Sequence, residues 1–304
     1  MVREGLAVTA AVLTAVAAAG CSGDGPEQAK PEKSFYVSLG DSLSVGVQPD
    51  GKGGFGETKE GYTDALYRSL NDRDSALRHE RMGCGGEDTS TFARGGMQGC
   101  EYPAGSQLAE AEKFLRENRG RVDLVTVDIG GNNFTGCAYD DNGEVATDID
   151  RSCVQEGLER AEEELPAIAE RLRSAAGDDV QIIGMTYYNP FLAALLLEDV
   201  NQALEGGGGT SEDLARYADG VLTDLNSTLT KAYGAQDIDV ADVSAAFDSG
   251  NFDVPAGSEG DVPANVAKIC DFTWMCDVAQ GPDIHTNAAG AREIAGVFEA
   301  EVRR

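Results

Sequence analysis

The chain has 304 residues, 53 of them acidic and 24 basic, which gives a net charge of −29 at neutral pH. This charge excludes a nucleic-acid partner, because binding to nucleic acid depends on lysine and arginine meeting phosphate. The acidity is typical of a well-solvated, salt-tolerant surface.

The beginning of the chain is not expected to belong to the fold. Arg3 is followed by an apolar run over 6–19, which is shorter than the roughly 20 residues that span a bilayer and fits a secretion signal. The run ends in Ala18-Ala19-Gly20-Cys21, which resembles the lipobox of bacterial lipoproteins, although leucine is usual where Ala18 stands. We expect 1–21 to be a signal peptide with lipidation at Cys21. The alternative is an ordinary cleaved signal with an incidental cysteine.

Residues 22–33 are rich in Gly, Pro, Glu and Lys, which predicts a flexible linker. The remaining segment, 34–304, has a length suited to one large domain. If Cys21 carries lipid, the protein is extracellular and anchored to the outer face of the cytoplasmic membrane. The lipid would then be its only membrane contact. The sequence leaves the oligomeric state open.

Apolar runs rich in β-forming residues alternate with helical patterns along this segment. Strands are predicted at 35–39, 78–82, 122–129, 180–187 and 238–243. Helices are predicted at 61–70, 106–118, 154–176 with a kink at Pro166, 190–203, 212–233 and 288–302. Such alternation predicts a five-stranded parallel sheet with helices on both faces, a three-layer α/β/α sandwich with flavodoxin-like winding. The functional site of such a sheet lies beyond the carboxyl ends of its strands.

The six cysteines after Cys21 form an even set, which in an exported protein indicates disulfides. Proximity in the sequence favours the pairs Cys84–Cys100, Cys137–Cys153 and Cys270–Cys276, each joining a loop rather than the core. A metal cluster is the competing interpretation, but the chain has no C-x-x-C spacing and only two histidines. We expect no metal. The acidic run 140–143 does not have the ligand spacing of a calcium loop.

Three polar segments are candidates for the functional site. Two directly follow a predicted strand, and the third comes after the last predicted strand. Gly40-Asp41-Ser42 follows the first strand, where a serine on a sharp turn is exposed, although an Asp/Ser helix cap would look the same. Asn132 follows the third strand and could donate to an oxyanion; an ordinary Asn/Gly turn is the alternative. His285 lies before the closing helix. The other histidine, His79, is expected to be solvated or on an edge strand.

These segments, in this order, resemble the SGNH (GDSL-type) hydrolases, a family defined by a GDS(L) block, a Gly block, a G-x-N-D block and a D-x-x-H block. The resemblance implies Ser42 as nucleophile, His285 as base and Asn132 as a side-chain oxyanion donor. Cys84 to Thr89 looks like the Cys-x-Gly-Glu-Thr segment of actinobacterial members, which implies Gly86 as a backbone donor. The N–H of Ser42 would be the third donor.

Two positions depart from the family pattern. Asn133 stands where the family usually has Asp, which leaves the oxyanion donor itself in place. Asp283 precedes His285 by two residues rather than three, and the position three before is Pro282. Either Asp283 still reaches the imidazole, or a main-chain carbonyl near Pro282 orients it and the site is a Ser–His dyad.

The resemblance implies a serine hydrolase that cleaves carboxylic esters by acyl transfer through an acyl-enzyme on Ser42, without a cofactor. The substrate would be a lipid or another small acyl ester, and 192–197 could line an acyl groove, unless it is a buried helix face. An acetyl-sugar esterase or a phospholipase is an alternative within the enzymes. A catalytically silent surface-binding lipoprotein that kept the fold is the alternative from another class.

Overall fold

The computed structural model describes residues 34–138, 149–196, 211–257, 262–277, 279–280 and 282–303. The predicted signal peptide, lipidation site, linker and acidic run therefore lie outside the described residues, as does 197–203 of one predicted helix. All described residues belong to one compact unit, Lys33–Arg304. In this part of the chain no helix is long and apolar enough to cross a membrane.

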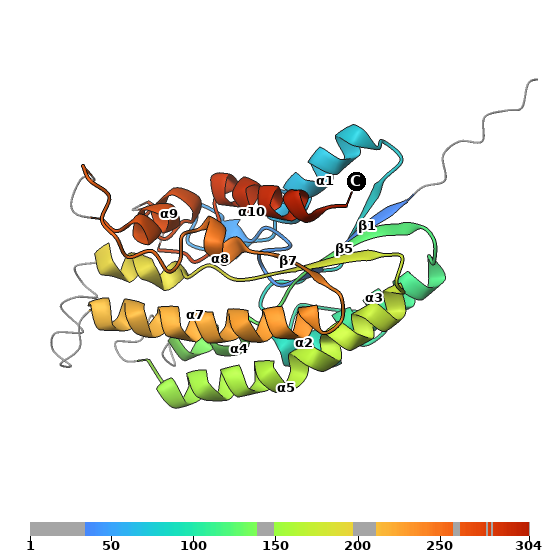
Figure 1. The fold of residues 1–304 in the computed structure, drawn as a ribbon, viewed down its shortest axis with the longest axis horizontal. Coiled ribbons are helices and arrows are strands. Elements are labelled where there is room, and N and C mark those ends of the chain that lie inside the picture. The colour runs from blue at the N-terminus through green and yellow to red at the C-terminus, as the bar shows by residue number, and fades with distance from the viewer. Residues whose placement is uncertain are drawn as a thin grey trace, which may run out of the picture. The chain divides into compact units, whose positions relative to one another are not determined.

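A parallel sheet forms the middle layer (Figure 1). Its strands are β1 (Phe35–Gly40), β4 (Arg78–Arg81), β5 (Val122–Asp128), β6 (Gln181–Met185) and β7 (Asp239–Ala241), paired in the order β4-β1-β5-β6-β7. Strands β1, β5 and β6 are largely apolar and almost wholly buried, as expected for a sheet covered on both faces. Counted along the chain the order is 2-1-3-4-5, the flavodoxin-like winding that was predicted, with its switch point between β1 and β5.

Helices cover both faces of the sheet (Figure 1). One face carries α1 (Tyr62–Arg73), α8 (Val243–Ala246), α9 (Ala264–Phe272) and α10 (Ala288–Glu301). The other carries α2 (Thr89–Arg94), α3 (Gln107–Glu117), α4 (Asn132–Thr135), α5 (Arg151–Ala176) and α7 (Ser211–Gly234). The predicted three-layer sandwich is therefore confirmed.

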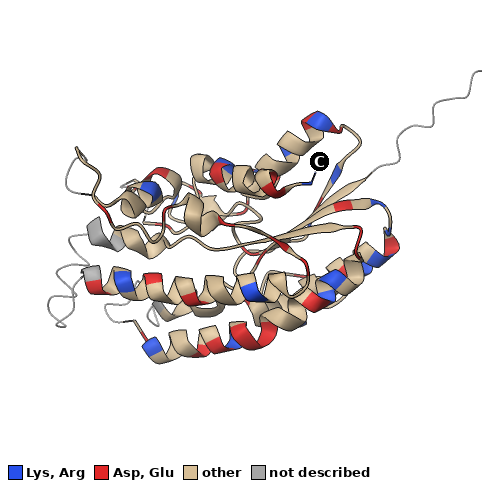
Figure 2. Ribbon diagram, viewed as in Figure 1, with Lys and Arg blue, Asp and Glu red and all other residues tan. Residues whose placement is uncertain are grey.

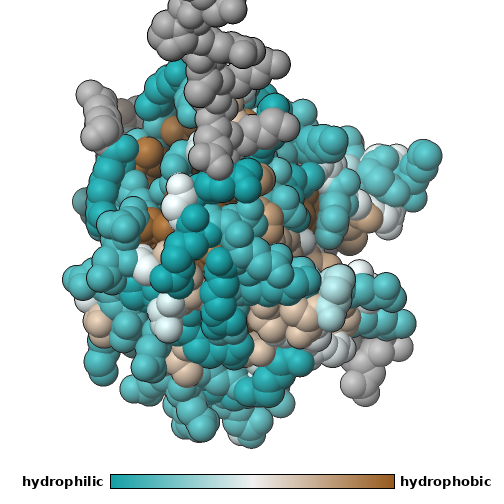
Figure 3. Space-filling model, turned by 90° about the vertical axis from the view of Figure 1, so that its right-hand side faces the viewer, coloured by the Kyte–Doolittle hydropathy of each residue, from teal (hydrophilic) through white to brown (hydrophobic). Residues whose placement is uncertain are grey.

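Side chains define where several helices begin. Ser106 caps α3 by accepting from the N–H of Ala109, and Asp150 caps α5 by accepting from Ser152 and Cys153. Asn287 caps α10 in the same way, directly after the segment that carries His285. Basic and acidic residues are interspersed along the helices of both outer layers (Figure 2). The described part of the face at the amino ends of the strands is largely hydrophilic (Figure 3).

Some details differ from the sequence predictions. The segment predicted as a helix at 190–203 begins as a 3-10 helix, η2 (Pro190–Leu196). A small antiparallel hairpin, β2 (Gln48–Pro49) with β3 (Phe55–Gly56), was not predicted, because its strands are too short for a periodic pattern. Helices α2, α4, α8 and α9 were missed for the same reason. Helix α5 continues through Pro166.

His79 is on the edge strand β4, one of the two placements that the sequence predicted, and its side chain is packed rather than solvated. Its ring stacks on Tyr36, with 4.6 Å between ring centroids, and on Tyr67 at 5.0 Å. Its Nε2 is hydrogen-bonded to Ser38 Oγ at 2.9 Å. Burial lowers the pKa of His79 to about 3, and the neighbouring Arg81 charge contributes to the decrease. The histidine is therefore a neutral part of the packing and is not among the residues that line the candidate pocket described below.

Candidate active site

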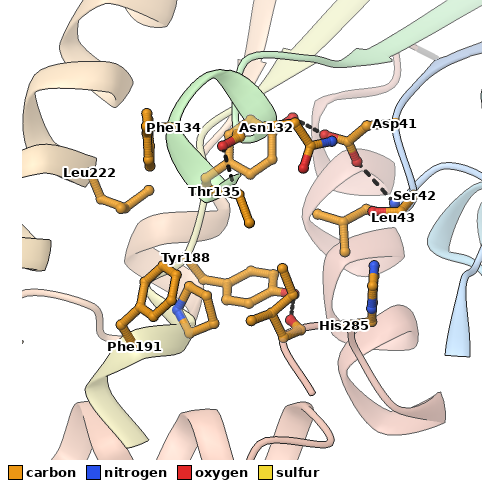
Figure 4. Close-up of a pocket in the computed structure, with 14 residues that line it drawn as sticks. Asp41, Ser42, Leu43, Asn132, Phe134, Thr135, Tyr188, Phe191, Leu222 and His285 are labelled. Atoms are coloured by element: carbon orange, nitrogen blue, oxygen red, sulfur yellow. Dashed lines mark hydrogen bonds between the residues drawn. The ribbon is translucent and has the colours of Figure 1, made fainter. Parts of the chain in front are cut away.

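The loops after β1 and β5 meet the segment before α10 at one pocket beyond the carboxyl ends of the strands (Figure 4). Ser42, Asn132 and His285 all line it, so the structure brings three of the predicted site residues together. Figure 4 shows Ser42 and His285 on one side of the pocket and Phe134, Phe191 and Leu222 on the other. The further lining residues are Asp41, Leu43, Gly131, Thr135, Tyr187, Tyr188, Pro190 and Ile284.

A buried carboxylate fixes the turn that carries Ser42. Asp41 Oδ1 accepts from the N–H of Leu43 at 3.0 Å, and Oδ2 accepts from the Tyr187 hydroxyl at 2.8 Å. The turn follows Gly40, whose φ of +138° lies in a region that favours glycine. The strand-to-helix turn predicted at Ser42 is thus a tight turn held by the preceding aspartate.

A second buried carboxyl lies beneath this turn. Asp128, the last residue of β5, accepts from the Tyr62 hydroxyl at 2.6 Å, and its main-chain oxygen accepts from Asp41 N at 3.1 Å. Burial, and next the nearby Asp41 charge, raise the pKa of Asp128 well above its ordinary value. Burial raises the pKa of Asp41 as well, and of the two carboxyls Asp41 is the one whose side chain accepts from the Ser42 turn.

Asp283 orients the histidine. Its Oδ1 and Oδ2 each lie 3.0 Å from His285 Nδ1, and Oδ1 also accepts from His285 N at 3.1 Å. Of the two arrangements that the sequence left open, the structure has the carboxylate on the imidazole. This leaves Nε2 to act as the base. In the described residues no hydrogen bond joins Ser42 to His285, a contact that often tightens only when substrate is bound.

Candidate oxyanion donors lie beside Ser42. A Cβ built on Gly85 would be 3.9 Å from Ser42 Cβ, so the loop 84–88 adjoins the serine, although Gly86 is not among the pocket-lining residues. Within the described residues, neither Ser42 N–H nor Gly86 N–H donates to a protein acceptor. Asn132 Nδ2 donates to Glu87 O at 3.0 Å, which places this amide against the same loop.

Asn133 has a structural role. It accepts from Thr89 N at 3.0 Å and donates to Thr89 Oγ1 at 2.8 Å and to Gly157 O at 3.2 Å. These bonds hold α2 and α5 against the end of β5. The departure from the family pattern at this position therefore leaves the amide of Asn132 unaffected.

Each disulfide lies near a segment that carries or supports a site residue. The predicted placement in loops rather than in the core is wrong for one of them, because Cys137 belongs to the core and Cys153 lies in α5. The pairs are Cys84–Cys100, Cys137–Cys153 and Cys270–Cys276, the three favoured by proximity in the sequence. The first adjoins Gly85 and Gly86, and the second follows α4, which carries Asn132. The third closes a turn in which Trp274 N donates to His285 O at 3.1 Å. In the part of the chain that the structure describes, no group of three or more Cys, His, Asp or Glu could hold a metal ion.

Phe55 and Phe191 are among the residues at the site that were not predicted. Phe55, on the unpredicted hairpin, is 61% exposed and its ring centroid lies 6.3 Å from that of His285. Phe191 lines the pocket, whereas the adjacent Leu192, which was considered for an acyl groove, is fully buried. Neither phenylalanine belongs to a motif, and the elements that carry them, β3 and η2, are too short to give a periodic pattern.

A serine on the turn after the first strand, an asparagine after the third and an aspartate-held histidine before the last helix define a hydrolase of the three-layer α/β/α type. The model of the GDSL-like lipase/acylhydrolase family matches residues 38–293, and the chain belongs to this family.

Two of the similar solved structures come from Streptomyces. An extracellular lipase from Streptomyces rimosus is 18% identical, with 88% of this chain and 99% of that chain covered at a TM-score of 0.50. A phospholipase A1 from Streptomyces albidoflavus is also 18% identical, with the same coverage and a TM-score of 0.49. A search of curated proteins found no match.

Proposed function

We propose that this hydrolase cleaves carboxylic esters through an acyl-enzyme on Ser42. The observation that carries the proposal is the convergence of Ser42, Asn132 and His285 on one pocket, with Asp283 on Nδ1 of the imidazole. A serine hydroxyl is a weak nucleophile until a base takes its proton, and an imidazole held in one tautomer supplies that base.

The reaction has two steps. His285 Nε2 takes the proton of Ser42 as Oγ attacks the ester carbonyl, and the negative charge on the carbonyl oxygen is stabilised by the N–H groups of Ser42 and Gly86 and by the Asn132 amide. The protonated imidazole then gives its proton to the leaving alkoxide, which departs as an alcohol. In the second step His285 deprotonates water, which attacks the acyl-enzyme. The protonated imidazole then returns its proton to Ser42 Oγ as the carboxylic acid is released.

The pocket supports an apolar acyl group. Its wall opposite Ser42 consists of Phe134, Phe191 and Leu222, and burying methylene groups against such side chains contributes about 0.8 kcal/mol each. A second hollow, lined by Ile149, Val154, Tyr217, Ala218 and Val221, adjoins this wall because Phe134 and Phe191 line both. An acyl chain that extends from Ser42 toward Phe191 would point toward this second hollow.

Hydrolysis of p-nitrophenyl acetate, butyrate, octanoate and palmitate by the wild type and by Ser42→Ala tests the proposal. We expect turnover by the wild type, loss of turnover in the variant, and labelling of the wild type alone by a fluorophosphonate. A wild type that neither hydrolyses any of these esters nor reacts with the fluorophosphonate would refute the proposal and favour a binding role.

We also propose that the protein is exported and held at the outer face of the cytoplasmic membrane by lipid on Cys21. The support is the apolar run over 6–19 followed by Ala19-Gly20-Cys21. Metabolic labelling with a radioactive fatty acid should label the wild type but not Cys21→Ser. An unlabelled wild type that is found in the medium would point to an ordinary cleaved signal.

A further inference from the structure

Glu87 is a buried carboxyl that the reaction does not use. It follows Gly86 directly, and its side chain is fully buried. Oε2 accepts from the Tyr102 hydroxyl at 3.2 Å and from Gln107 Nε2 in a short hydrogen bond. Oε1 is also buried and has no hydrogen-bond partner among the described residues. Burying a carboxyl oxygen without a partner is costly, so the placement of Glu87 requires an explanation.

Gln107 connects this carboxyl to the end of β1, the strand that the Ser42 turn follows. Gly40 N donates to Gln107 Oε1 at 2.6 Å, and Gln107 Nε2 donates to Gly40 O at 3.0 Å. The amide thus occupies both main-chain groups of the last residue of β1, two positions before Ser42. A side chain from α3 therefore joins the turn of the nucleophile to Glu87.

The main chain of Glu87 makes the third connection. Its carbonyl oxygen accepts from Asn132 Nδ2 at 3.0 Å, so the amide at the end of β5 is bonded to the same residue. Glu87 is consequently linked to the Ser42 turn through its side chain, to Asn132 through its carbonyl and to Gly86 through the peptide bond.

We propose that Glu87 is a positioning residue that sets the distances among the three oxyanion donors, Ser42 N–H, Gly86 N–H and the Asn132 amide. The inference rests on the proposed ester hydrolysis. Oxyanion donors act only within about 2.7–3.1 Å of the developing charge, and loss of one typically costs about 10²–10³-fold in kcat. A residue that fixes the separation of all three would therefore affect kcat far more than KM.

The charge on Glu87 provides a signature that a purely structural role would not give. Burial raises the pKa of Glu87 to about 7. The other titratable groups around it are Asp88 and Asp41, together with Tyr102 and Glu57, which accepts from Gly85 N at 3.5 Å. Above pH 7 the carboxylate is charged in a buried place where one oxygen has no donor, so we expect the loop to shift and kcat to fall.

The test compares the full-length wild type with Glu87→Ala, Glu87→Gln and Glu164→Gln. Glu164 is the matched control, because it accepts from Thr89 Oγ1 at 2.6 Å and so holds α2, the helix that directly follows the loop, without contacting Gly40 or Asn132. For each protein we would measure kcat and KM for p-nitrophenyl butyrate from pH 5.5 to 9, affinity for an alkyl boronic acid, and the thermal midpoint. Ser42→Ala is included as the inactive reference.

We expect Glu87→Ala to lower kcat by about 10²-fold, with KM changed less than about threefold and boronic acid affinity reduced in parallel with kcat. Glu87→Gln should retain kcat within about threefold at pH 6 and lack the decrease of the wild type above pH 7. Glu164→Gln should change the thermal midpoint but neither kcat nor the pH profile.

The proposal is overturned if Glu87→Ala lowers only the thermal midpoint. It is also overturned if Glu87→Gln keeps the wild-type pH profile, a comparison that remains valid where Glu87→Ala does not fold. An active wild type with insensitive Glu87 variants rejects this inference alone, whereas a wild type no more active than Ser42→Ala rejects the proposed function and this inference with it.

Discussion

Both carboxylate oxygens of Asp283 lie 3.0 Å from Nδ1 of His285, although only one residue separates the two in the sequence. The contact is possible because the segment turns back on itself there, with Asp283 Oδ1 also accepting from His285 N. Asp283 is 6% exposed, so its bond to the imidazole is protected from competing water. A carboxylate in this place keeps the imidazole in the tautomer whose Nε2 accepts a proton.

Replacing Asp283 with asparagine should therefore lower kcat by about 10²–10⁴-fold with little change in KM, since the amide no longer favours the productive tautomer. Steady-state hydrolysis of p-nitrophenyl butyrate measures this. Asp277→Asn is the control, because Asp277 caps the same loop by accepting from Ala279 N and Gln280 N and does not contact the histidine. If the kcat of Asp283→Asn lies within about tenfold of the wild-type value, the result would favour a Ser–His dyad.

The boundary between the two apolar hollows predicts the preferred acyl length. Phe191 lines both hollows, so its truncation should open one into the other and shift the best substrate toward longer chains. We expect Phe191→Ala to raise the ratio of kcat/KM for octanoate over butyrate by about tenfold, comparable to the burial of two methylene groups. Phe252→Ala removes a half-buried phenylalanine outside both hollows and should leave the ratio unchanged. An unaltered ratio in Phe191→Ala would show that the acyl chain leaves the site by another route.

The position of Phe55 leads us to expect that its ring contacts the substrate at the entrance of the pocket. A large apolar side chain that is 61% exposed beside the His285 ring can cover part of a bound ester but cannot take part in proton transfer. Phe55→Ala should raise KM by about threefold to tenfold and leave kcat close to that of the wild type. Val254→Ala tests the other large exposed apolar residue among those described, at 47% exposure, and should change neither constant. A decrease in kcat alone would instead mean that Phe55 orients the histidine.

The sequence predicted the sheet and most of the site because both depend on local signals. The buried strands are continuous apolar runs, and Ser42, Asn132 and His285 stand at fixed offsets from strand ends or a helix start. The partner of His285 remained open, because the two-residue spacing does not determine whether the segment turns back. Glu87 and Gln107 could not be foreseen as a pair, since their contact depends on how α3 packs beneath the loop. Phe55 was missed because its strand has two residues and no periodic pattern.

The stacked His79 predicts how stability depends on pH. Its pKa in the folded protein is about 3, below the ordinary value of 6.5, because burial disfavours the charged ring. The His79 imidazole therefore binds a proton more readily in the unfolded chain than in the folded protein. The stability due to neutral His79 is fully present above about pH 6.5 and is lost as the pH falls toward 3. His79→Phe keeps the ring against Tyr36 but removes the bond to Ser38 and the titration.

At pH 7.5 we expect this variant to be less stable than the wild type by about 1 kcal/mol, the usual contribution of one hydrogen bond. The difference should shrink and then reverse as the pH is lowered to 4.5, because only the wild type has a histidine at this position to protonate. Urea unfolding of both proteins at several pH values measures the difference and cancels the titration of the many carboxylates they share. A difference that stays constant across this range would show that the proton taken up on acid unfolding does not belong to His79.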